Sequence, residues 1–470
     1  MRVSKVIILG AGLTGLSTAF HLEQAGYTDY QIFEKDSIPG GLLRSNTQDG
    51  FTFDFTGHLV HISDPYFKSF VDYVANLSSW SCLQRNAFVY SHDTYTPYPF
   101  QSNLYGLPTA VIQECISKFI TKKSSQKAPK TFYDWVLKYF GKGIGKHFFF
   151  PYNSKILSYD IKKVHPSWTG RFVPNTTLEA LFEGALHQKS ASSAGYNSSF
   201  YYPKQGGIQH LVTSILAKLN TRIITNHQAT SIDSKNKTVL FSNGRQESYD
   251  HLISTIPLNH LTANLQESSA TNLAQTSKKL ICNTVLNFNL GINIPQFSNK
   301  HWIYFPEKKY EFYRLGFWHN FASSLVPDGC SAIYGEMSYL PGTKSPAQIK
   351  NMLIRARAKT LSVLGLSDAN VITQKDLTLN HAYVIYDHWR EKNLQQLLAQ
   401  LKELKVHSVG RFGEWKYSSM QEAVLDGKKT AELIVGKVIT PNFEEKKIIP
   451  ATIAHLQLPD QKQIHAKELS

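Results

Sequence analysis

Residues 6–15 read VIILGAGLTG, and this stretch decides the fold. The apolar run at residues 6–9 predicts a buried β-strand. The glycine-rich segment that follows predicts a tight turn, and apolar side chains then recur at helical spacing over residues 16–22, up to Gly26. The order strand, turn and helix indicates the first unit of a Rossmann-like α/β domain.

The glycines of this turn have separate physical roles. Gly10 permits the turn itself, Gly12 allows the backbone to approach a pyrophosphate, and Gly15 lets the helix pack closely on the strand. Leu13 and Thr14 lie at the start of the helix, whose free N–H groups and positive dipole end favour a phosphate. These residues therefore predict a dinucleotide site.

A second predicted strand, at residues 30–33, is followed by Glu34, nineteen residues after Gly15. At this spacing a carboxylate can accept hydrogen bonds from the ribose of an adenosine. We place Lys35 in the same site. A glycine pattern alone would be a weak indication, but the strand, the helix and the acidic residue agree with it. A dinucleotide site is therefore favoured over a chance glycine turn.

A second glycine turn indicates which dinucleotide binds. The segment Pro39-Gly40-Gly41-Leu42 resembles the turn that wraps the flavin end of the cofactor in FAD-dependent oxidases and mutases, whereas NAD dehydrogenases usually lack it. Residues 222–254 then alternate like strands broken by turns, and residues 254–257 resemble the point where such flavoproteins return to the cofactor sheet. The sequence therefore predicts FAD, bound by a domain that is discontinuous along the chain.

Composition limits the class of protein and its partners. The chain has 470 residues, 42% of them hydrophobic and 18% charged, which is an ordinary globular balance. A net charge of +15 permits nucleic acid, an anionic membrane surface or a small polyanion as partner, and the absence of a dense basic run favours the small anion. Four scattered cysteines predict reduced thiols and no metal site. We expect a cytoplasmic protein without membrane insertion or a nucleic-acid partner.

The rest of the chain divides by its periodicity. Residues 107–120 and 132–149 have helical spacing, whereas residues 301–305 and 310–318 alternate like strands. A helix is predicted after Tyr417. We therefore predict an α/β fold in which a Rossmann-like FAD-binding domain carries a helical insertion and an antiparallel-sheet substrate domain. The predicted boundaries are 1–100, 201–265 and 401–440 for the FAD-binding domain, 101–200 for the insertion, 266–400 for the sheet-rich domain and 441–470 for a tail.

Several separated motifs resemble one family, UDP-galactopyranose mutase, and more its eukaryotic-type branch than its bacterial one. The resemblance covers about residues 5–435. The motifs, in the order of the family, are Gly57-His58, PYPFQSN (97–103), PYNSK (151–155), WIYFP (302–306) with Phe312-Tyr313-Arg314, and GRFGEWKY (410–417).

This resemblance implies an isomerase. The family interconverts UDP-galactopyranose and UDP-galactofuranose with reduced FAD and no net redox change, while the sugar is held on the flavin N5. It implies a UDP-sugar as substrate and NAD(P)H or another reductant for the flavin. The alternative is an FAD-dependent oxidoreductase of the amine oxidase or protoporphyrinogen oxidase type, which shares the glycine motifs. A noncatalytic anion or nucleic-acid binder with structural FAD is a further alternative.

The resemblance assigns four residues to the chemistry. Arg171 and Arg314 match the two arginines of the pyrophosphate site, where a planar guanidinium offers paired donors that lysine lacks. Arg411 matches an arginine near the flavin and the sugar, and His58 matches a histidine on a loop beside the flavin. These are the predicted catalytic residues.

It also assigns substrate and cofactor contacts. Those for the substrate are Tyr304, Tyr383 and Tyr417 for the phosphates, Tyr98, Phe100 and Gln101 for the uridine, Asn153 and Asn197 for the hexose and its loops, and Trp302 against the sugar. Gly57, His58, Gly410, Met420 and Gln421 are assigned to the cofactor. For Tyr98 and Phe100, the alternative is a proline-bounded loop whose rings pack inward.

Two departures from the family pattern affect the hexose. Ile156-Leu157 stand where the family has a tryptophan, and Phe321 stands where it has a tyrosine. The phenylalanine lacks the hydroxyl donor of that tyrosine. The nucleotide sugar can therefore differ from the galactose derivative, and we leave the oligomeric state open.

Overall fold

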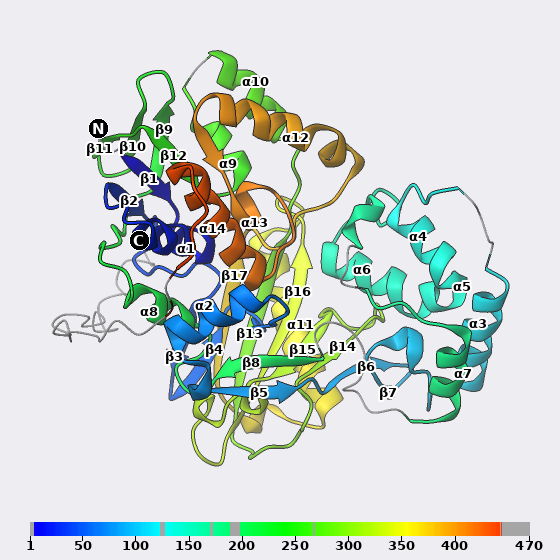
Figure 1. Ribbon diagram of the computed structural model, residues 1–470. Helices are drawn as coiled ribbons and strands as arrows, with labels where there is room; N and C mark the ends of the chain where they lie inside the picture. The colour runs from blue at the N-terminus through cyan, green and yellow to red at the C-terminus, as the bar shows by residue number, and fades with distance from the viewer. Residues whose placement is uncertain are drawn as a thin grey trace.

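A parallel sheet carries the N-terminal motif (Figure 1). The computed structural model describes residues 4–122, 127–169, 173–188, 198–266, 268–441 and 443, without the side chains of 268–272. The strand order of this sheet is β18 (Val406–Ser408), β12 (His251–Ser254), β1 (Val6–Leu9) and β2 (Tyr30–Phe33). Three distant parts of the chain therefore meet in one sheet.

Apolar side chains bury this sheet on both faces. Ile8 packs with Leu16 and Val424 in one core cluster, and its neighbour Ile7 belongs to another, because successive strand residues point to opposite faces. Leu16 and Val424 come from helices α1 (Leu13–Gln24) and α14 (Met420–Val435), which pack on each other. Helix α14 is the helix predicted after Tyr417.

A seven-stranded sheet forms the second layer. Its order is β17 (Val371–Leu379), β13 (Thr284–Ile292), β16 (Ser331–Tyr339), β15 (Arg314–Phe317), β14 (Trp302–Tyr304), β6 (Ala87–Ser91) and β7 (Thr94–Pro97). Neighbouring strands are antiparallel except β14 and β6, which are parallel. Every residue of β13 is buried, because the strand has a partner on each side and its side chains enter core clusters such as those of Leu286 and Val285.

Helix α11 (Pro346–Leu364) packs its apolar side on this sheet and was not foreseen within the predicted sheet-rich region. Its N-terminus is a capping box of Ser345 and Gln348. Met352 and Leu353 are among the few apolar side chains that it places against the sheet. The apolar residues of this helix do recur at helical spacing, at 349, 352, 353, 356, 361 and 364, so the sequence carried a signal that the strand-like interpretation of the region overlooked.

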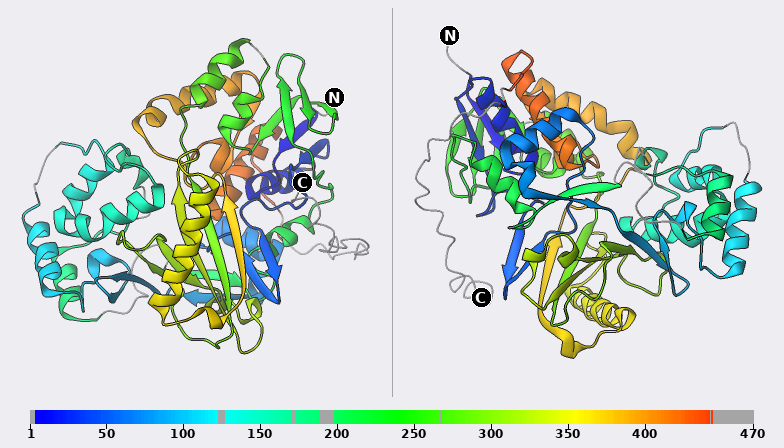
Figure 2. Two further views of the ribbon diagram at one scale, coloured as in Figure 1. Left: turned by 180° about the vertical axis from the view of Figure 1, so that it is seen from behind. Right: turned by 60° about the horizontal axis from the view of Figure 1, so that its bottom comes forward.

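The helical insertion lies to one side of the two sheets in all three views (Figures 1 and 2). Its helical segments are α3 (Thr109–Ile120), α4 (Phe132–Tyr139), α5 (Gly141–Ile144), the π-helical turn Gly145–Phe149, α6 (Phe150–Leu157), the 3₁₀ turn η4 (Pro166–Trp168) and α7 (Leu178–Leu186). They enclose their own apolar core, which includes Phe119, Val136 and Leu181. Gly143 permits the close crossing with α3, because a Cβ there would lie 2.5 Å from the Glu114 carbonyl oxygen.

Smaller elements complete the fold. They are the strands β3 (Ser45–Gln48), β4 (Phe51–Asp54), β5 (Trp80–Gln84), β8 (Ser199–Pro203), β9 (Ala229–Asp233), β10 (Thr238–Phe241) and β11 (Gln246–Ser248), and the helices α2 (Pro65–Ala75), α8 (Gln209–Leu216), α9 (Leu258–Ala263), α10 (Ser268–Ser277), α12 (His388–Glu403) and α13 (Gly410–Gly413). Short 3₁₀ turns occupy Leu77–Ser79, Phe100–Ser102, Trp318–Asn320, Ser323–Leu325 and Asp368–Asn370.

The predicted α/β class is confirmed, with a parallel sheet, a helical insertion and an antiparallel sheet. The domain boundaries stay a prediction, and β6 and β7, at residues 87–97, pair into the seven-stranded sheet. Of the predicted tail, only residues 441 and 443 lie within the described residues. Among the helices of the described chain, none has the length and apolar character that a bilayer crossing requires.

Candidate active site

A cavity of about 630 Å³ lies at the carboxyl ends of β1, β2 and β12. Its lining residues include Gly10 after β1, Glu34 after β2 and Thr255 after β12. Across from them, Trp302 and Arg314 contribute from the seven-stranded sheet. The carboxyl edge of a parallel sheet is the usual ligand site of doubly wound folds. One cavity therefore joins the predicted cofactor motif to the predicted substrate residues.

The first glycine turn leaves room for a ligand. Gly10 has φ +97°, which favours glycine, and a Cβ at Gly15 would lie 2.1 Å from the Gly10 carbonyl oxygen. Gly12 differs, because a Cβ there would have no heavy atom within 4 Å, although the residue lines the cavity. The space beside Gly12 is thus kept for something other than protein.

Glu34 and the second glycine turn complete this end. One carboxylate oxygen of Glu34 accepts from the Ala11 N–H at 2.9 Å and the other from the Asp36 N–H at 3.0 Å. Each oxygen retains a second acceptor position for a ribose hydroxyl. The N–H of Gly40 donates to the Ala11 carbonyl at 2.9 Å, and a Cβ at Gly41 would lie 3.3 Å from Gly12 Cα. The two glycine turns pack against each other beside the cavity. Their open backbone and the Glu34 carboxylate fit the pyrophosphate and the ribose of FAD.

Most predicted cofactor residues line the cavity. They are Gly10, Gly12, Leu13, Thr14, Glu34, Lys35, Gly40, Gly41, Leu42, Gly57, His58 and Met420. Gly15 and Gly410 lie outside the lining and make close backbone packing, since a Cβ at Gly410 would lie 2.6 Å from Thr14 Oγ1. Gln421 also lies outside it, and its side-chain oxygen accepts from the N–H groups of Ser63 and Asp64, both at 2.9 Å.

At the opposite end of the cavity, Arg314 is fixed by a buried carboxylate. Its Nε and Nη2 donate to Glu336 Oε1 at 3.0 and 2.5 Å, and the Tyr313 hydroxyl donates to Glu336 Oε2 at 2.8 Å. Glu336 is 1% exposed and is the cross-strand partner of Arg314. The guanidinium therefore faces the cavity in one orientation, with Nη1 free of hydrogen bonds to the described residues.

Arg411 and two phenols form a second cationic group beside it. The rings of Tyr383 and Tyr417 are stacked, with centroids 6.0 Å apart, and the Arg411 guanidinium carbon lies 4.8 Å from the Tyr417 ring centroid. Nη1 and Nη2 of Arg411 donate to the carbonyls of Ser418 and Ala382 at 3.0 and 2.8 Å. Its buried Nε has no partner among the described residues. Phenol and guanidinium donors therefore gather where an anion could bind.

Burial keeps the phenols of Tyr304 and Tyr383 protonated. Desolvation raises the pKa of Tyr304 and of Tyr383, against the opposing effect of the nearby Arg314 charge. A protonated phenol is a hydrogen-bond donor throughout the physiological range. Burial, followed by the charges of Arg411 and Arg314, lowers the pKa of His58 to about 3. His58 is therefore neutral near pH 7.

The lowered pKa of His58 makes a prediction about acid stability. Below an unfolded-state pKa of about 6.5, the unfolded chain takes up a proton that folded His58 does not, so stability is lost as pH falls from about 6.5 towards 3. Between pH 7.5 and 5.0 we expect wild-type protein to lose about 1–2 kcal/mol more than His58→Gln, measured by urea unfolding. Equal losses in the two proteins would mean that His58 titrates normally.

The structure does not bring every predicted substrate residue to the cavity. Trp302, Tyr304, Arg314, Tyr383, Arg411 and Tyr417 line it, whereas Tyr98, Phe100, Gln101 and Asn153 do not. Arg171 and Asn197 lie outside the described residues.

The four residues away from the lining make contacts within the protein. Phe100 is fully buried and stacks on Phe148 with ring centroids 5.3 Å apart, so its ring packs inward as the alternative expected. The Gln101 amide donates to the Pro174 carbonyl at 2.7 Å. Asn153 donates to the Phe149 carbonyl at 2.9 Å, and the Tyr98 ring lies 5.0 Å from that of Tyr304.

Sequence patterns missed three residues of this end of the cavity. Tyr334 lines the cavity from β16, Glu336 holds Arg314, and Tyr152 packs its ring edge-on against Tyr304 at 5.4 Å. Tyr152 belongs to the PYNSK motif, but the family resemblance gave it no role. Tyr334 and Glu336 lie in a continuously buried strand, where no local signal separates a site residue from a core residue.

Comparison with known proteins identifies the family. The profile of the family described as flavin-containing amine oxidoreductase matches residues 13–435. The chain belongs to this family. It is therefore a flavin-dependent enzyme, and its glycine turns, Glu34 and cavity fit FAD as the cofactor.

A crystal structure of reduced UDP-galactopyranose mutase has a TM-score of 0.86, with 26% identity over 92% of this chain and 96% of that one. The predicted resemblance is confirmed, whereas the eukaryotic-type branch stays a prediction. Curated relatives match over short segments. They are a 4,4'-diapolycopene oxygenase of Methylomonas, 43% identical over 15% of either protein, and a 4,4'-diapophytoene desaturase of Staphylococcus aureus (strain COL), 33% identical over 18% of this chain and 17% of that protein.

Proposed function

We propose that the protein interconverts UDP-galactopyranose and UDP-galactofuranose with bound, reduced FAD. One observation carries this proposal: a single cavity is lined both by the two glycine turns and by Arg314, Arg411 and four phenols. An oxidase acting on an amine has no use for paired guanidiniums, because they repel the positive charge of a protonated amine. A diphosphate placed beside a flavin uses all of them.

The diphosphate would bind to the guanidinium groups of Arg314 and Arg411. Arg314 donates two N–H groups to Glu336, so its Nη1 can donate to a phosphate oxygen. Tyr304, Tyr383 and Tyr417 add hydroxyl donors that burial keeps protonated in the first two cases. Charge-assisted hydrogen bonds of this kind strengthen as the UDP leaving group gains negative charge, so they lower the barrier to its departure.

Bound FAD, when reduced, would supply the nucleophile for the sugar, and the chain's residues supply position and charge. Glu34 would hold the adenosine ribose, and the backbone at Gly12 would admit the cofactor pyrophosphate. Neutral His58, beside the cavity, adds no charge that would compete with the diphosphate for the arginines. NAD(P)H or another reductant would keep the flavin reduced.

The uridine and hexose contacts belong to the proposal in a modified form. Tyr98 packs beside Tyr304, so a uridine extending past Tyr304 would approach Tyr98 first. Phe100 and Gln101 would support this wall from behind, because their ring and amide already have protein partners. Trp302 lines the cavity and, in this proposal, would contact the sugar. A cytoplasmic location stays a prediction.

The assay incubates dithionite-reduced, FAD-loaded protein with UDP-galactofuranose and separates the products by chromatography. We expect UDP-galactopyranose from the reduced protein, little from the oxidised protein, and no oxygen consumption linked to turnover. The family match makes an amine-oxidising flavoenzyme the rival. Failure of the reduced protein to convert the sugar nucleotide, together with peroxide formation from an amine, would establish that rival.

A further inference from the structure

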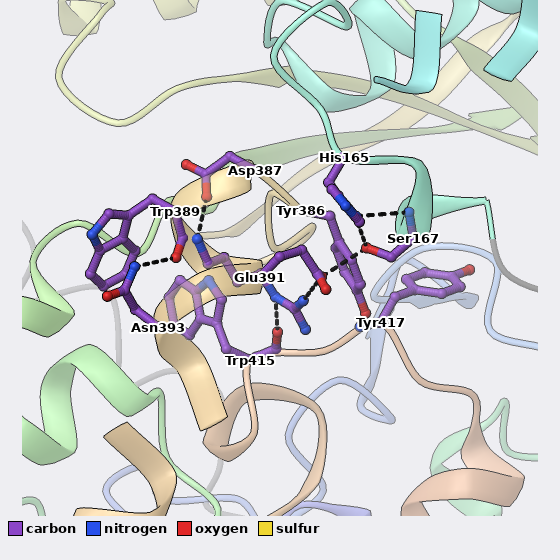
Figure 3. Close-up of polar contacts among 10 residues, drawn as sticks. His165, Ser167, Tyr386, Asp387, Trp389, Glu391, Asn393, Trp415 and Tyr417 are labelled. Carbon is purple, nitrogen blue, oxygen red and sulfur yellow. Dashed lines mark hydrogen bonds and ion pairs between the residues drawn. The ribbon is translucent and has the colours of Figure 1, made fainter. Parts of the chain in front are cut away.

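A second polar cluster lies beside Tyr417, outside the cavity lining (Figure 3). Its centre is Arg390, in the first turn of α12, which is only 7% exposed. Asp387 caps this helix by accepting the Arg390 N–H at 2.7 Å. None of the roles proposed above uses Arg390, and a buried guanidinium requires an explanation because its desolvation is costly.

The guanidinium of Arg390 is held on three sides. Its Nε donates to the carbonyl oxygen of Trp415 at 2.9 Å, and its Nη1 donates to Glu391 Oε1 at 2.5 Å. Its central carbon lies 3.8 Å from the centroid of the Tyr386 ring, a close cation–π contact. A planar fork that donates in two directions while it stacks on a ring is a geometry that lysine cannot reproduce.

Tyr386, in turn, contacts the backbone of Tyr417. Its hydroxyl oxygen accepts the backbone N–H of Tyr417 at 2.8 Å. Arg390 and Tyr386 together therefore hold the two ends of the short segment 415–417, one through a carbonyl and the other through an amide (Figure 3). Trp415 has φ +47°, which a bulky residue adopts only under constraint from its surroundings.

The same cluster reaches the helical insertion. Glu391, the acceptor for Arg390, also accepts from the Ser167 hydroxyl of η4 at 2.7 Å. In that turn, the Trp168 ring lies edge-on to the Tyr417 ring at 5.6 Å. The Tyr417 phenol is thus in contact with both Trp168 and Tyr383, whose own ring centroids lie 6.3 Å apart.

We infer that Arg390 is a positioning residue that, with Tyr386, fixes the backbone of residues 415–417 and so sets the Tyr417 phenol beside Tyr383. The step from position to ligand binding rests on the proposed function, in which Tyr417 donates to the diphosphate of UDP. Arg390 touches neither the cavity nor a ligand in it. Its effect on binding therefore passes through Tyr417.

The first experiment measures position directly. Hydrogen–deuterium exchange of the FAD-loaded protein is followed at the Tyr417 amide in wild type, Arg390→Met, Arg390→Lys and Tyr386→Phe. We expect exchange to accelerate roughly tenfold in Arg390→Met and Tyr386→Phe, and less in Arg390→Lys, on the scale of one lost hydrogen bond. Lys392→Met is the matched control, because it removes a charge from an exposed position of the same helix. Unchanged exchange in a folded Arg390 variant would overturn the inference.

The second experiment tests the path to the ligand by UDP titration of Tyr417→Phe, Arg390→Met and the double variant. We expect each single change to raise the dissociation constant for UDP roughly tenfold. The double variant should bind UDP about as well as the weaker of the two single variants, because Arg390 affects UDP only through Tyr417. Multiplied losses, or faster exchange with unchanged UDP affinity, would contradict the inference. If Arg390→Met fails to fold, Arg390→Lys carries both tests. Wild-type protein that does not bind UDP would refute the proposed function, and the exchange result would still decide whether Arg390 positions residues 415–417.

Discussion

Replacing Gly12 by valine is expected to give a folded but colourless protein. Gly12 has φ −75°, which any residue can adopt, and a Cβ there meets no protein atom within 4 Å. The valine side chain would instead enter the cavity at the place of the cofactor pyrophosphate. We expect FAD affinity to fall roughly 100-fold or more, because the valine side chain would clash with the bound cofactor at a cost of about 3 kcal/mol in binding free energy.

The measurement is the ratio of flavin to protein absorbance in purified Gly12→Val, with circular dichroism to confirm folding. Gly12→Ala adds a single methyl group and should retain an intermediate amount of flavin. Gly15→Val is the contrasting variant, because its Cβ would lie 2.1 Å from the Gly10 carbonyl oxygen and should disturb the turn itself. A folded, fully yellow Gly12→Val protein would show that FAD does not bind against this turn.

Removing Arg314 is expected to affect stability and UDP binding together. Arg314→Ala leaves Glu336 as an uncompensated carboxylate that is 1% exposed, and breaking such a buried pair costs about 3–5 kcal/mol of unfolding free energy. Loss of one charge-assisted donor to the diphosphate should cost a further ~1–3 kcal/mol in UDP binding. FAD should remain bound, because Arg314 comes from β15 of the seven-stranded sheet, whereas the first glycine turn and Glu34 follow strands of the parallel sheet.

The double variant Arg314→Ala/Glu336→Gln separates these two effects. Its neutral amide no longer needs a cationic partner, so we expect most of the unfolding free energy to return, while UDP affinity stays low. Urea unfolding and UDP titration of the two variants provide the comparison. Recovery of UDP affinity along with stability would mean that Arg314 supports the fold and does not bind the nucleotide.

Local sequence encoded the cofactor end of the site almost completely. The turn of residues 10–15 and the acid at Glu34 lie within one strand–helix–strand unit, so their geometry follows from neighbours in the chain. Arg314 and Arg411, which family motifs mark, both line the cavity, and their catalytic roles stay a prediction.

Contacts between residues that are far apart in the chain could not be predicted from local sequence. Glu336 meets Arg314 only because β15 and β16 pair in one register, and Arg390 meets Trp415 across a separation of 25 residues. Phe100 was assigned to a ligand, yet its ring packs into the insertion core, since a loop motif does not say which way a side chain points. Helix α11 was missed although its apolar residues recur at helical spacing, because the strand-like segments around it led the whole region to be interpreted as sheet.

The most direct test of the central claim is the crystal structure of the FAD-loaded protein soaked with UDP. We expect the isoalloxazine in the cavity beside His58, and the diphosphate oxygens within hydrogen-bonding distance of Arg314 and of the phenols of Tyr304, Tyr383 and Tyr417. UDP bound outside the cavity, or phosphates that leave Arg314 and these phenols without a contact, would contradict the proposed chemistry.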